Sequence, residues 1–368
     1  MTFENVNKNF GFGCMRLPMI EKEVDHEHFC KMVDKFIEEG FNYFDTAHGY
    51  IGGKSETAIR ECLAKRYTRD KYILTNKLTE NYFESEKDIR PFFETQLEAC
   101  GVEYFDFYLM HAQNRNNYKK FKACRAYETA YALKAEGKVR HVGLSFHDTA
   151  DILDMILTEQ PEVEVVQLQF NYFDYEDDKV QGKLCYEVCV KHGKPVIVME
   201  PVRGGSLVNL PDKAKTIVDS LVGESAASLA IRYAASFDGI FMVLSGMSNI
   251  EQMEENVSYM KDFKPLSENE HKAVNEICRL FKKIELIKCT SCRYCVDGCP
   301  AKIAIPEIFG CVNTYRRFKE KQTWRYNNVT RERGKASDCI GCGKCEKACP
   351  QMLTIREYLK EAVDIFGK

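Results

Sequence analysis

Short apolar stretches alternate with segments of helical periodicity along residues 1–265. Eight stretches rich in β-branched and aromatic residues predict strands, and they span residues 10–15, 41–45, 72–77, 105–111, 140–146, 163–170, 195–200 and 240–246. Helical spacing of apolar positions predicts helices at residues 28–39, 55–65, 88–100, 123–136, 149–157, 179–191, 225–236 and 251–260. Eight strands, each followed by a helix, are typical of an α/β fold of the TIM (β/α)8 barrel class. An open doubly wound sheet is the alternative, but no G-x-G-x-x-G follows a predicted strand.

A different organisation begins after residue 265. Ser267-x-x-Glu270 has the form of a capping box, in which a hydroxyl and a carboxylate satisfy the first N–H groups of a helix. We expect a connecting helix within residues 266–285, followed by a small, mainly helical ferredoxin-like domain at residues 286–368. The predicted architecture is therefore a barrel at residues 1–265 with a second, smaller domain.

The expectation of a ferredoxin-like domain rests on eight of the 17 cysteines, which form two copies of one pattern. The copies are Cys289-x2-Cys292-x2-Cys295-x3-Cys299-Pro300 and Cys339-x2-Cys342-x2-Cys345-x3-Cys349-Pro350. In bacterial two-cluster ferredoxins this spacing lets three thiolates hold one [4Fe–4S] cluster while the fourth ligates the other cluster. We expect one cluster on Cys289, Cys292, Cys295 and Cys349, and a second on Cys339, Cys342, Cys345 and Cys299. A zinc ribbon is the alternative, although it needs only paired C-x2-C knuckles.

The stretch between the two cysteine runs, residues 301–338, is rich in basic side chains. They are Arg316, Arg317, Lys319, Lys321, Arg325, Arg331, Arg333 and Lys335. A positive flank of this kind could dock an acidic electron-carrier protein. It could equally be the solvated face of two short helices, so both interpretations stay open at this point.

The composition and charge of the chain argue against several classes of protein. The net charge of −3 and the pI of about 6.3 give no global basic field, so we expect no nucleic-acid partner. The N-terminus lacks a basic segment followed by an apolar stretch, and the longest apolar runs are strand-sized. We therefore expect neither a secretory signal nor a membrane span. Nine further cysteines lie in apolar-patterned segments, as small buried hydrophobes do in a reducing cytoplasm, which predicts a cytoplasmic protein.

Four ionisable residues lie at or just after the C-terminal ends of predicted strands, where barrels carry their catalytic groups. They are Asp45, Tyr50, Lys77 and His111, in the segments Phe44-Asp-Thr-Ala-His-Gly-Tyr50, Leu74-Thr-Asn-Lys77 and Tyr108-Leu-Met-His111. With the opening Gly11-Phe-Gly-Cys-Met-Arg-Leu-Pro18, these segments resemble the aldo/keto reductase superfamily, whose catalytic tetrad is Asp, Tyr, Lys and His in this order. The resemblance covers residues from about 9 to 260, and the cysteine-rich tail is similar to the iron–sulfur branch of that family.

The resemblance implies hydride transfer between NAD(P)H and a small carbonyl or alcohol substrate. Reducing a ketone by hydride leaves an alkoxide, which needs a proton donor within hydrogen-bond reach. In the family pattern Tyr50 is that donor, Lys77 lowers its pKa, and Asp45 holds Lys77 by a salt bridge. His111 would donate a hydrogen bond that positions the carbonyl oxygen. Each residue alone has an ordinary structural explanation, so the prediction rests on their coincidence at successive strand ends.

The same resemblance implies a site for a nicotinamide dinucleotide. Ser145 and Gln167 match positions that bind the carboxamide, and the adenosine end would meet Gly246, Met247, Ser248, Gln252, Glu255 and Asn256. A helix N-terminus there also suits a phosphate. The chain departs from the family in two respects: Glu200 stands where many members have an aromatic residue on the nicotinamide, and Gly246 and Gln252 replace basic groups that hold the 2′-phosphate of NADP(H). This slightly favours NAD(H) and leaves NADP(H) open, with Arg203 or another loop as an alternative source of charge.

Three functional hypotheses fit these features. The first is a carbonyl reductase or alcohol dehydrogenase in which the two clusters are accessory, as structural, electron-transferring or redox-gating groups. A hydride carries two electrons whereas a [4Fe–4S] cluster normally exchanges one. The second hypothesis is therefore a ferredoxin-linked oxidoreductase that passes electrons between the barrel, by way of a flavin, and a partner protein. The third is a non-catalytic, redox-sensing barrel, which the intact tetrad disfavours because a sensor needs no tuned tyrosine.

Overall fold

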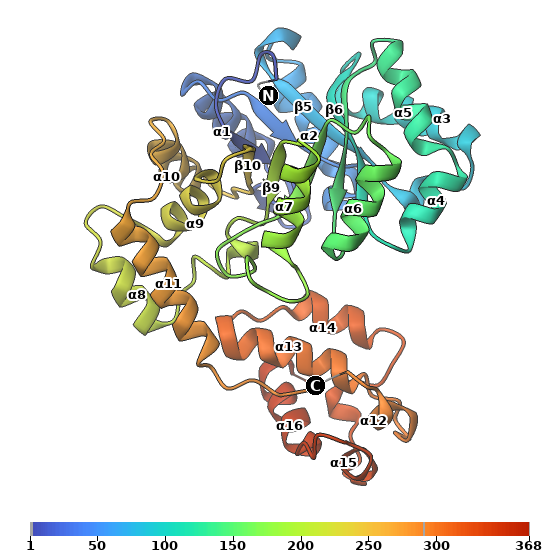
Figure 1. The fold of residues 1–368 in the computed structure, drawn as a ribbon, viewed down its shortest axis with the longest axis vertical. Coiled ribbons are helices and arrows are strands. Elements are labelled where there is room, and N and C mark those ends of the chain that lie inside the picture. Colours follow the sequence, from blue (N-terminus) through green and yellow to red (C-terminus); the bar gives the residue numbers. More distant parts are fainter. Residues whose placement is uncertain (1–2, 290, 368) are drawn as a thin grey trace. The chain divides into compact units, whose positions relative to one another are not determined.

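The computed structural model of the chain describes residues 3–289 and 291–367. These residues form two compact units. The barrel unit comprises residues 3–204 and 227–271, and the second unit comprises residues 205–226 and 272–367. Figure 1 traces the helices and strands along the chain. Among the helices of the described residues, none is both long and apolar enough to cross a membrane.

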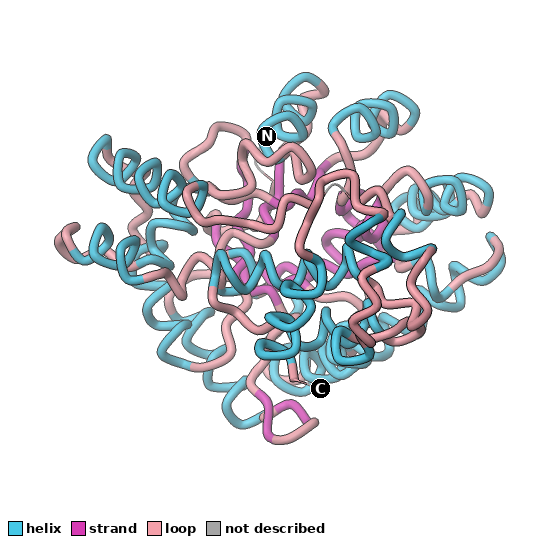
Figure 2. The backbone as a smooth tube through the Cα atoms, turned by 90° about the horizontal axis from the view of Figure 1, so that it is seen from below, coloured by secondary structure: helices cyan, strands magenta, loops and turns pink. Residues whose placement is uncertain are grey.

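Within the described residues, eight parallel strands close into a barrel in the order β1-β10-β9-β8-β7-β6-β5-β4. They are β1 (Phe10–Gly13), β4 (Tyr43–Asp45), β5 (Ile73–Leu78), β6 (Phe105–Gln113), β7 (Val139–Phe146), β8 (Val165–Gln169), β9 (Val196–Met199) and β10 (Ile240–Ser245). Figure 2 shows the strands gathered at the centre of this unit with helices outside them. The predicted TIM barrel is confirmed, and all eight predicted strands are present.

Apolar side chains fill the barrel interior. The buried inward layer consists of Tyr43, Ile73, Phe107, Leu109, Val165, Ile197, Met242 and Leu244. Gly143 fits into this layer because a Cβ at that position would lie 2.6 Å from Val165 Cγ1. Successive side chains of a strand point to opposite faces, so positions two or four residues further along share the inward face. Asp45, Lys77, His111, Gln167 and Met199 therefore face the interior at the C-terminal end of the barrel.

The predicted helices of the barrel are present with shifted ends. They are α1 (His26–Glu38), α2 (Lys54–Ile59), α3 (Glu86–Cys100), α5 (Ala126–Ala135), α6 (Ala150–Glu159), α7 (Gly182–Lys191), α9 (Ala226–Ala235) and α10 (Ile250–Met260). The helix expected at residues 123–136 begins only at Ala126, because Arg125 adopts the left-handed conformation with φ 51°.

Two short helices and a small hairpin were not predicted. They are α4 (Asn117–Ala123), α8 (Asp212–Asp219) and the pair β2 (Met19–Ile20) and β3 (Glu23–Val24). Helices α4 and α8, with the sequences NYKKFKA and DKAKTIVD, have only seven and eight residues, which is shorter than the window of about 11 residues over which helical periodicity is read.

Helix α11 (Glu268–Lys282) begins in the barrel unit and continues into the second unit. The predicted capping box is present. Ser267 N–H donates to Glu270 Oε2 at 2.6 Å, and Glu270 N–H donates to Ser267 Oγ at 3.3 Å. Both groups satisfy N–H donors that the first helical turn leaves without an intrahelical partner.

The rest of the second unit is helical around a small apolar core. Its helices are α12 (Tyr294–Asp297), α13 (Ile305–Phe318), α14 (Thr323–Thr330), α15 (Lys344–Lys347) and α16 (Ile355–Phe366). Helix α13 packs on α16 through buried residues that include Phe309, Val312 and Leu359. Outside that core, Arg316 binds Glu361 with two hydrogen bonds of 2.8 and 2.6 Å. Residues 301–338 thus contain two helices, α13 and α14, that carry three of the basic side chains named above, Arg316, Arg317 and Arg325.

The two cysteine runs are tied together through Gly334. Gly334 N–H donates to Lys302 O at 3.2 Å, and Ala304 N–H donates to Gly334 O at 3.2 Å. A Cβ at residue 334 would lie only 2.2 Å from Ala301 O, so the close approach of the two backbones requires glycine. The segment before the second run therefore lies directly against the segment after the first run.

Candidate active site and cysteine-lined cavities

Lys77 is the centre of the site at the C-terminal end of the barrel. Its side chain is fully buried, and its ammonium donates to Asp45 Oδ1 at 2.6 Å, to Thr46 O at 2.8 Å and to Tyr50 Oη at 3.2 Å. These three bonds use all three N–H groups of the ammonium. Tyr50 reaches the site because it opens a 3-10 turn, Tyr50–Gly53, just after β4. The expected salt bridge between Asp45 and Lys77 is therefore present, with the phenol of Tyr50 on the same ammonium.

Burial and charge act in opposite directions on these groups. Burial lowers the pKa of Lys77, but the carboxylate of Asp45 and the phenol of Tyr50 raise it by more, so the ammonium stays charged. Burial raises the pKa of Tyr50, and the ammonium of Lys77 only partly reverses that rise. The net pKa of Tyr50 lies above its ordinary value, whereas the sequence-based expectation was a lowered one. At neutral pH the phenol therefore holds its proton.

His111 faces Tyr50 across the site. The two ring centroids are 6.1 Å apart in an edge-to-face arrangement, and His111 Nδ1 is 2.6 Å from Thr79 Oγ1. Burial, followed by the charge of Lys77, lowers the pKa of His111 to about 3, so the imidazole is neutral. If the Thr79 hydroxyl donates to Nδ1, the ring proton lies on Nε2, and that N–H can donate to a carbonyl oxygen.

Gln167 and Ser145, which are expected to bind a carboxamide, form hydrogen bonds with Asp45 and with the backbone next to His111. Gln167 Nε2 donates to Asp45 Oδ2 at 3.0 Å, and Ser145 Oγ accepts from Ala112 N–H at 2.7 Å. Ala112 follows His111 in the left-handed conformation, with φ 52°, so Ser145 stabilises the backbone turn beyond the histidine. Among the described residues, no hydrogen bond uses the Ser145 O–H proton or Gln167 Oε1. These are the donor and the acceptor that a carboxamide needs, so the pair fits a nicotinamide.

A buried polar network behind Lys77 was not predicted from the sequence. Glu56, which is fully buried, accepts from Asn76 Nδ2 at 2.8 Å and lies 2.6 Å from His48 Nδ1. Gln96 Nε2 donates to Lys77 O at 3.0 Å and to Asn76 Oδ1 at 3.0 Å. The network fixes the backbone of β5 at the residue that carries the ammonium.

The residues expected at the adenosine end divide into two groups. Gly246, Ser248, Gln252 and Glu255 are exposed at the end of β10 and the start of α10. Met247 and Asn256 are buried, and Asn256 Nδ2 donates to Ser245 Oγ at 3.1 Å, so both help to pack α10 on β10. The helix N-terminus is capped by Asn249, whose side chain accepts from Gln252 N–H at 2.9 Å.

Arg16 supplies a basic group beside this region that sequence reasoning missed. A Cβ at Gly246 would lie 3.4 Å from Arg16 Cβ and Cδ, and a Cβ at Gly204 would lie 3.1 Å from Arg16 Nη2. Ser248 Oγ donates to Arg16 O at 2.9 Å. The exposed Arg16 side chain therefore spans from the end of β10 to the loop after β9. The sequence shows this arginine in the Met-Arg-Leu-Pro segment, but Arg16 lies beside Gly246 only because the barrel closes between β1 and β10.

Glu200 lies just beyond β9, and the last residue of that strand is Met199. Met199 shares the inward face with Ile197, whereas Glu200 turns into the following loop with φ 59°. Burial raises the pKa of Glu200, and the positive charges of Arg16 and Arg203 oppose that rise. Arg203 Nε lies 3.0 Å from both carboxylate oxygens of Asp174, so this cation is anchored in the barrel unit. The side chain next to the barrel mouth is thus Met199.

A hollow of about 470 Å³ opens at the rim of the barrel between the loops after β7 and β8. Its lining includes His147, Asp148, Gln169 and Lys179. Burial lowers the pKa of His147, so this imidazole is neutral at physiological pH. The hollow directly follows the strand ends of Ser145 and Gln167, and half of its lining side chains are polar.

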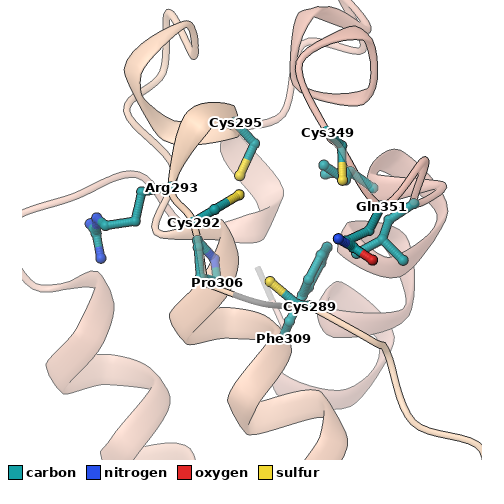
Figure 3. A pocket seen from close by; sticks show the side chains of 10 residues that line it. Cys289, Cys292, Arg293, Cys295, Pro306, Phe309, Cys349 and Gln351 are labelled. Carbon is teal, nitrogen blue, oxygen red and sulfur yellow. The ribbon is translucent and has the colours of Figure 1, made fainter.

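The eight cysteines of the two runs surround two separate cavities in the second unit. Cys289, Cys292, Cys295 and Cys349 line a cavity of about 310 Å³, and Figure 3 shows their sulfur atoms turned toward a common space. Cys299, Cys339, Cys342 and Cys345 line another of about 320 Å³. The fourth cysteine of each run thus joins the first three of the other run, as the spacing predicted. We call these cavities site A (Cys289, Cys292, Cys295, Cys349) and site B (Cys339, Cys342, Cys345, Cys299).

The donor set of each cavity fits a cubane better than a single ion. Among the described residues, four thiol groups and no histidine line each cavity, and thiolates are the usual ligands of [4Fe–4S] clusters. In the described parts of the chain, no three His, Cys, Asp or Glu side chains stand close enough to bind one metal ion. A zinc ribbon would bring its four ligands that close.

Comparisons with known proteins agree with both parts of the chain. Residues 9–279 match the model of the aldo/keto reductase family, and residues 288–354 match that of a 4Fe-4S dicluster domain. L-galactose dehydrogenase of Arabidopsis thaliana is 26% identical over 70% of this chain and 85% of its own. An NADH-specific methylglyoxal reductase of Escherichia coli is 23% identical over 60% and 78%. An aldo-keto reductase of Klebsiella pneumoniae, solved with NADPH, superposes with a TM-score of 0.60 at 20% identity over 73% and 90%.

The chain therefore belongs to the aldo/keto reductase family, with a 4Fe-4S dicluster domain after the barrel. It is an oxidoreductase of that family. One of the named relatives is named for NADH, while the Klebsiella structure holds NADPH. The relatives thus include both nicotinamide dinucleotides.

Proposed function

We propose that this protein is a carbonyl reductase or alcohol dehydrogenase that uses a nicotinamide dinucleotide, with Tyr50 as the proton donor and acceptor. The observation that carries the proposal is the buried ammonium of Lys77, which donates hydrogen bonds to both Asp45 and Tyr50. A lysine so fully enclosed is costly to bury unless its charge is used or paired. The ammonium of Lys77 is paired with the carboxylate of Asp45 and donates a hydrogen bond to the phenol of Tyr50.

Each side chain of the site has a separate role in carbonyl reduction. A bound NAD(P)H would supply the hydride. His111, as the neutral imidazole, donates a hydrogen bond from Nε2 to the carbonyl oxygen, and Tyr50 gives its proton to the same oxygen as negative charge develops there. Lys77 then stabilises the tyrosinate, and Asp45 keeps the ammonium in place. Because the pKa of Tyr50 is raised, the phenol is protonated at neutral pH, which is the form that gives its proton in carbonyl reduction.

The dinucleotide would lie across the strand ends from β7 to β10. Ser145 and Gln167 would bind its carboxamide, and Met199 would contact the nicotinamide in place of an aromatic ring. Arg16 would meet a phosphate, and the exposed Ser248, Gln252 and Glu255 would border the adenosine end. The basic group of Arg16 beside Gly246 supports NADP(H) as well as NAD(H).

The second unit would hold two [4Fe–4S] clusters, one in site A and one in site B. When bound, these clusters supply one-electron transfer. A second candidate function is therefore a ferredoxin-linked oxidoreductase that exchanges electrons with an acidic carrier protein. The observation that favours it is the charge of the module: residues 286–368 contain 16 Lys and Arg against nine Asp and Glu, whereas residues 1–285 contain 36 against 46.

Tyr50→Phe tests the main proposal. The variant keeps the ring beside Lys77 and removes only the acidic hydroxyl, so carbonyl reduction should fall by about 10²-fold or more while NADPH and NADH still bind. Dinucleotide binding is followed by fluorescence titration. Tyr104→Phe is the matched control, because Tyr104 lies before β6 at the opposite end of the barrel, where its hydroxyl accepts from Arg140. Undiminished turnover in Tyr50→Phe would remove Tyr50 as the proton donor.

A further inference from the structure

The two cysteine runs are repeats of one another, but their surroundings differ in charge. Each ligand of the first run matches the residue 50 positions later in the second, as Cys289 matches Cys339. At the same offset, Tyr294 corresponds to Lys344 and Asp297 corresponds to Lys347. Just after the prolines, Lys302 corresponds to Met352. Three equivalent pairs of positions therefore place a lysine in one member and an uncharged or acidic side chain in the other.

The crossing of the chain puts Lys302 and Lys344 next to residues that line site B. Ala301, which precedes Lys302, lines site B, while Gln351, which precedes Met352, lines site A. Lys344 and Lys347 lie on α15, whose Cys345 is a site B ligand position. Lys302 and Lys344 therefore border site B, and Lys347 lies on the same helix between Cys345 of site B and Cys349 of site A; we call these three residues the lysine rim. Site A is bordered at the equivalent positions by Met352, Tyr294 and Asp297.

The lysine rim is exposed and its charges are not used within the protein. All three side chains are exposed, and across residues 3–289 and 291–367 none of them forms an ion pair. The two nearby carboxylates are occupied: Glu346 binds Arg356 at 2.8 Å, and Asp338 accepts from Lys335 N–H at 2.7 Å. Ile340, which lines site B, is 72% exposed. An exposed apolar residue within a charged rim is the usual composition of a protein–protein docking patch.

We propose that the lysine rim docks a small acidic one-electron carrier protein and that electrons enter or leave the second unit through site B. This inference rests on the iron–sulfur part of the proposed function. Complementary charge raises the association rate of two proteins and orients them on encounter. In the reducing direction, the reduced carrier would lose one electron and a cluster bound in site B would gain it.

The arrangement of the two sites defines the order in which they receive an electron. Helix α12 of site A contacts α15 of site B, so the two sites are neighbours. Positive side chains favour the more negative, reduced form of a nearby cofactor. The lysine rim therefore favours the reduced state of a cluster bound in site B, beside the docked carrier, whereas Arg293, which lines site A, is ion-paired with Glu307. Site B is the first acceptor and site A the second.

The test uses the full-length holoprotein and an acidic plant-type [2Fe–2S] ferredoxin as the probe. Binding is measured by isothermal titration at about 25 mM and about 200 mM salt, because charge-driven association weakens as ionic strength rises. In the first variant Lys302, Lys344 and Lys347 are all changed to Gln. We expect its affinity for the ferredoxin to fall about fivefold or more. Anaerobic stopped-flow should show slower electron transfer from the reduced ferredoxin by a similar factor.

The matched control removes three positive charges from the basic stretch of α13 and α14 instead. Lys319, Lys321 and Arg325 are exposed in that stretch, and changing them to Gln should leave ferredoxin affinity within about twofold. Iron content and the visible spectrum check that both variants keep their clusters. If the triple rim variant loses iron, Lys344→Gln and Lys347→Gln are tested singly, and each should still weaken binding.

Three results would overturn the proposal. They are no salt-sensitive binding of the ferredoxin to the wild-type holoprotein, no loss of affinity when the rim is neutralised, and an equal loss in the control variant. Building a second rim by Tyr294→Lys, Asp297→Lys and Met352→Lys should instead strengthen binding. Tyr50→Phe should bind the ferredoxin like the wild type, so a failure of the reductase proposal is distinguishable from a failure of this one.

Discussion

Asp45 and Lys77 form a buried ion pair whose contributions to stability and to activity can be separated by substitution. Three variants separate the two roles: Asp45→Asn, Lys77→Met and the double variant. Each single change leaves one buried charge without its partner. The double change removes both charges and keeps side chains of similar size. The asparagine introduced by Asp45→Asn can still accept from Gln167 through its Oδ1 atom, so the framework at the carboxamide position is retained.

The expected loss of stability follows from the geometry of the ion pair between Asp45 and Lys77. At the 2.6 Å separation of Lys77 Nζ and Asp45 Oδ1, the Coulomb attraction is about 6 kcal/mol for an effective dielectric constant of about 20. Desolvation of both ions offsets much of this gain in the native pair. Breaking a buried pair by removing one partner costs about 3–5 kcal/mol, because the other charge stays buried and unpaired. Additive effects would then destabilise the double variant by about 6–10 kcal/mol.

We expect a large departure from additivity. The double variant should be no less stable than either single variant, which corresponds to an interaction energy of about 3 kcal/mol. Carbonyl reduction should stay at least about 10²-fold below the wild type in all three, because none of them keeps the full ammonium–phenol arrangement.

The assay is urea unfolding followed by far-ultraviolet circular dichroism. Trp324, the only tryptophan, lies in the second unit, so its fluorescence reports the unfolding of that unit separately. The three variants should leave the fluorescence transition unchanged and shift only the remaining part of the dichroism signal. Additive destabilisation within about 0.5 kcal/mol, or recovery of turnover in the double variant, would refute the reasoning.

Two further predictions concern the ligands and the dinucleotide. Because the fourth cysteine of each run joins the other run, the pair Cys289→Ser with Cys349→Ser should keep about half of the iron, whereas Cys289→Ser with Cys299→Ser should lose nearly all of it; the reverse result would mean uncrossed ligation. Arg16→Gln should weaken NADPH binding by about tenfold, with Arg16→Lys retaining most of the affinity, as measured by fluorescence titration. Equal affinity in Arg16→Gln and wild type would show that Arg16 does not contact the dinucleotide.

Much of the barrel follows from sequence because its strands are buried on both faces. Residues 105–111 and 163–170, for instance, are largely apolar runs, which is the pattern of a parallel strand covered by helices. Once eight such units are recognised, the fold itself predicts that Asp45, Lys77 and His111 meet at one end. The cysteine composition of the two cavities also follows from the sequence. The spacing of the cysteines within each run determines which thiolates can reach a common cluster, and this depends little on the rest of the chain.

What sequence could not supply depends on contacts between distant segments. Arg16 lies beside Gly246 only because β1 and β10 close the barrel, and these strands are about 230 residues apart in the chain. Glu200 and Met199 differ by one position at a strand end, and one residue reverses the face to which a side chain points. The raised pKa of Tyr50 was missed because the residue pattern contains the charge of Lys77 but not the depth of burial.

The central claim is that Tyr50, and not His111, delivers the proton, and its most direct test is the pH dependence of turnover in both directions. Burial keeps Tyr50 protonated, since its pKa is raised above its ordinary value, and the pKa of His111 is lowered to about 3. Carbonyl reduction should therefore stay flat from about pH 6 to about pH 9 and fall only as the phenol ionises, whereas alcohol oxidation should rise throughout that range. A loss of reduction centred near about pH 6.5, the ordinary pKa of histidine, would contradict the account.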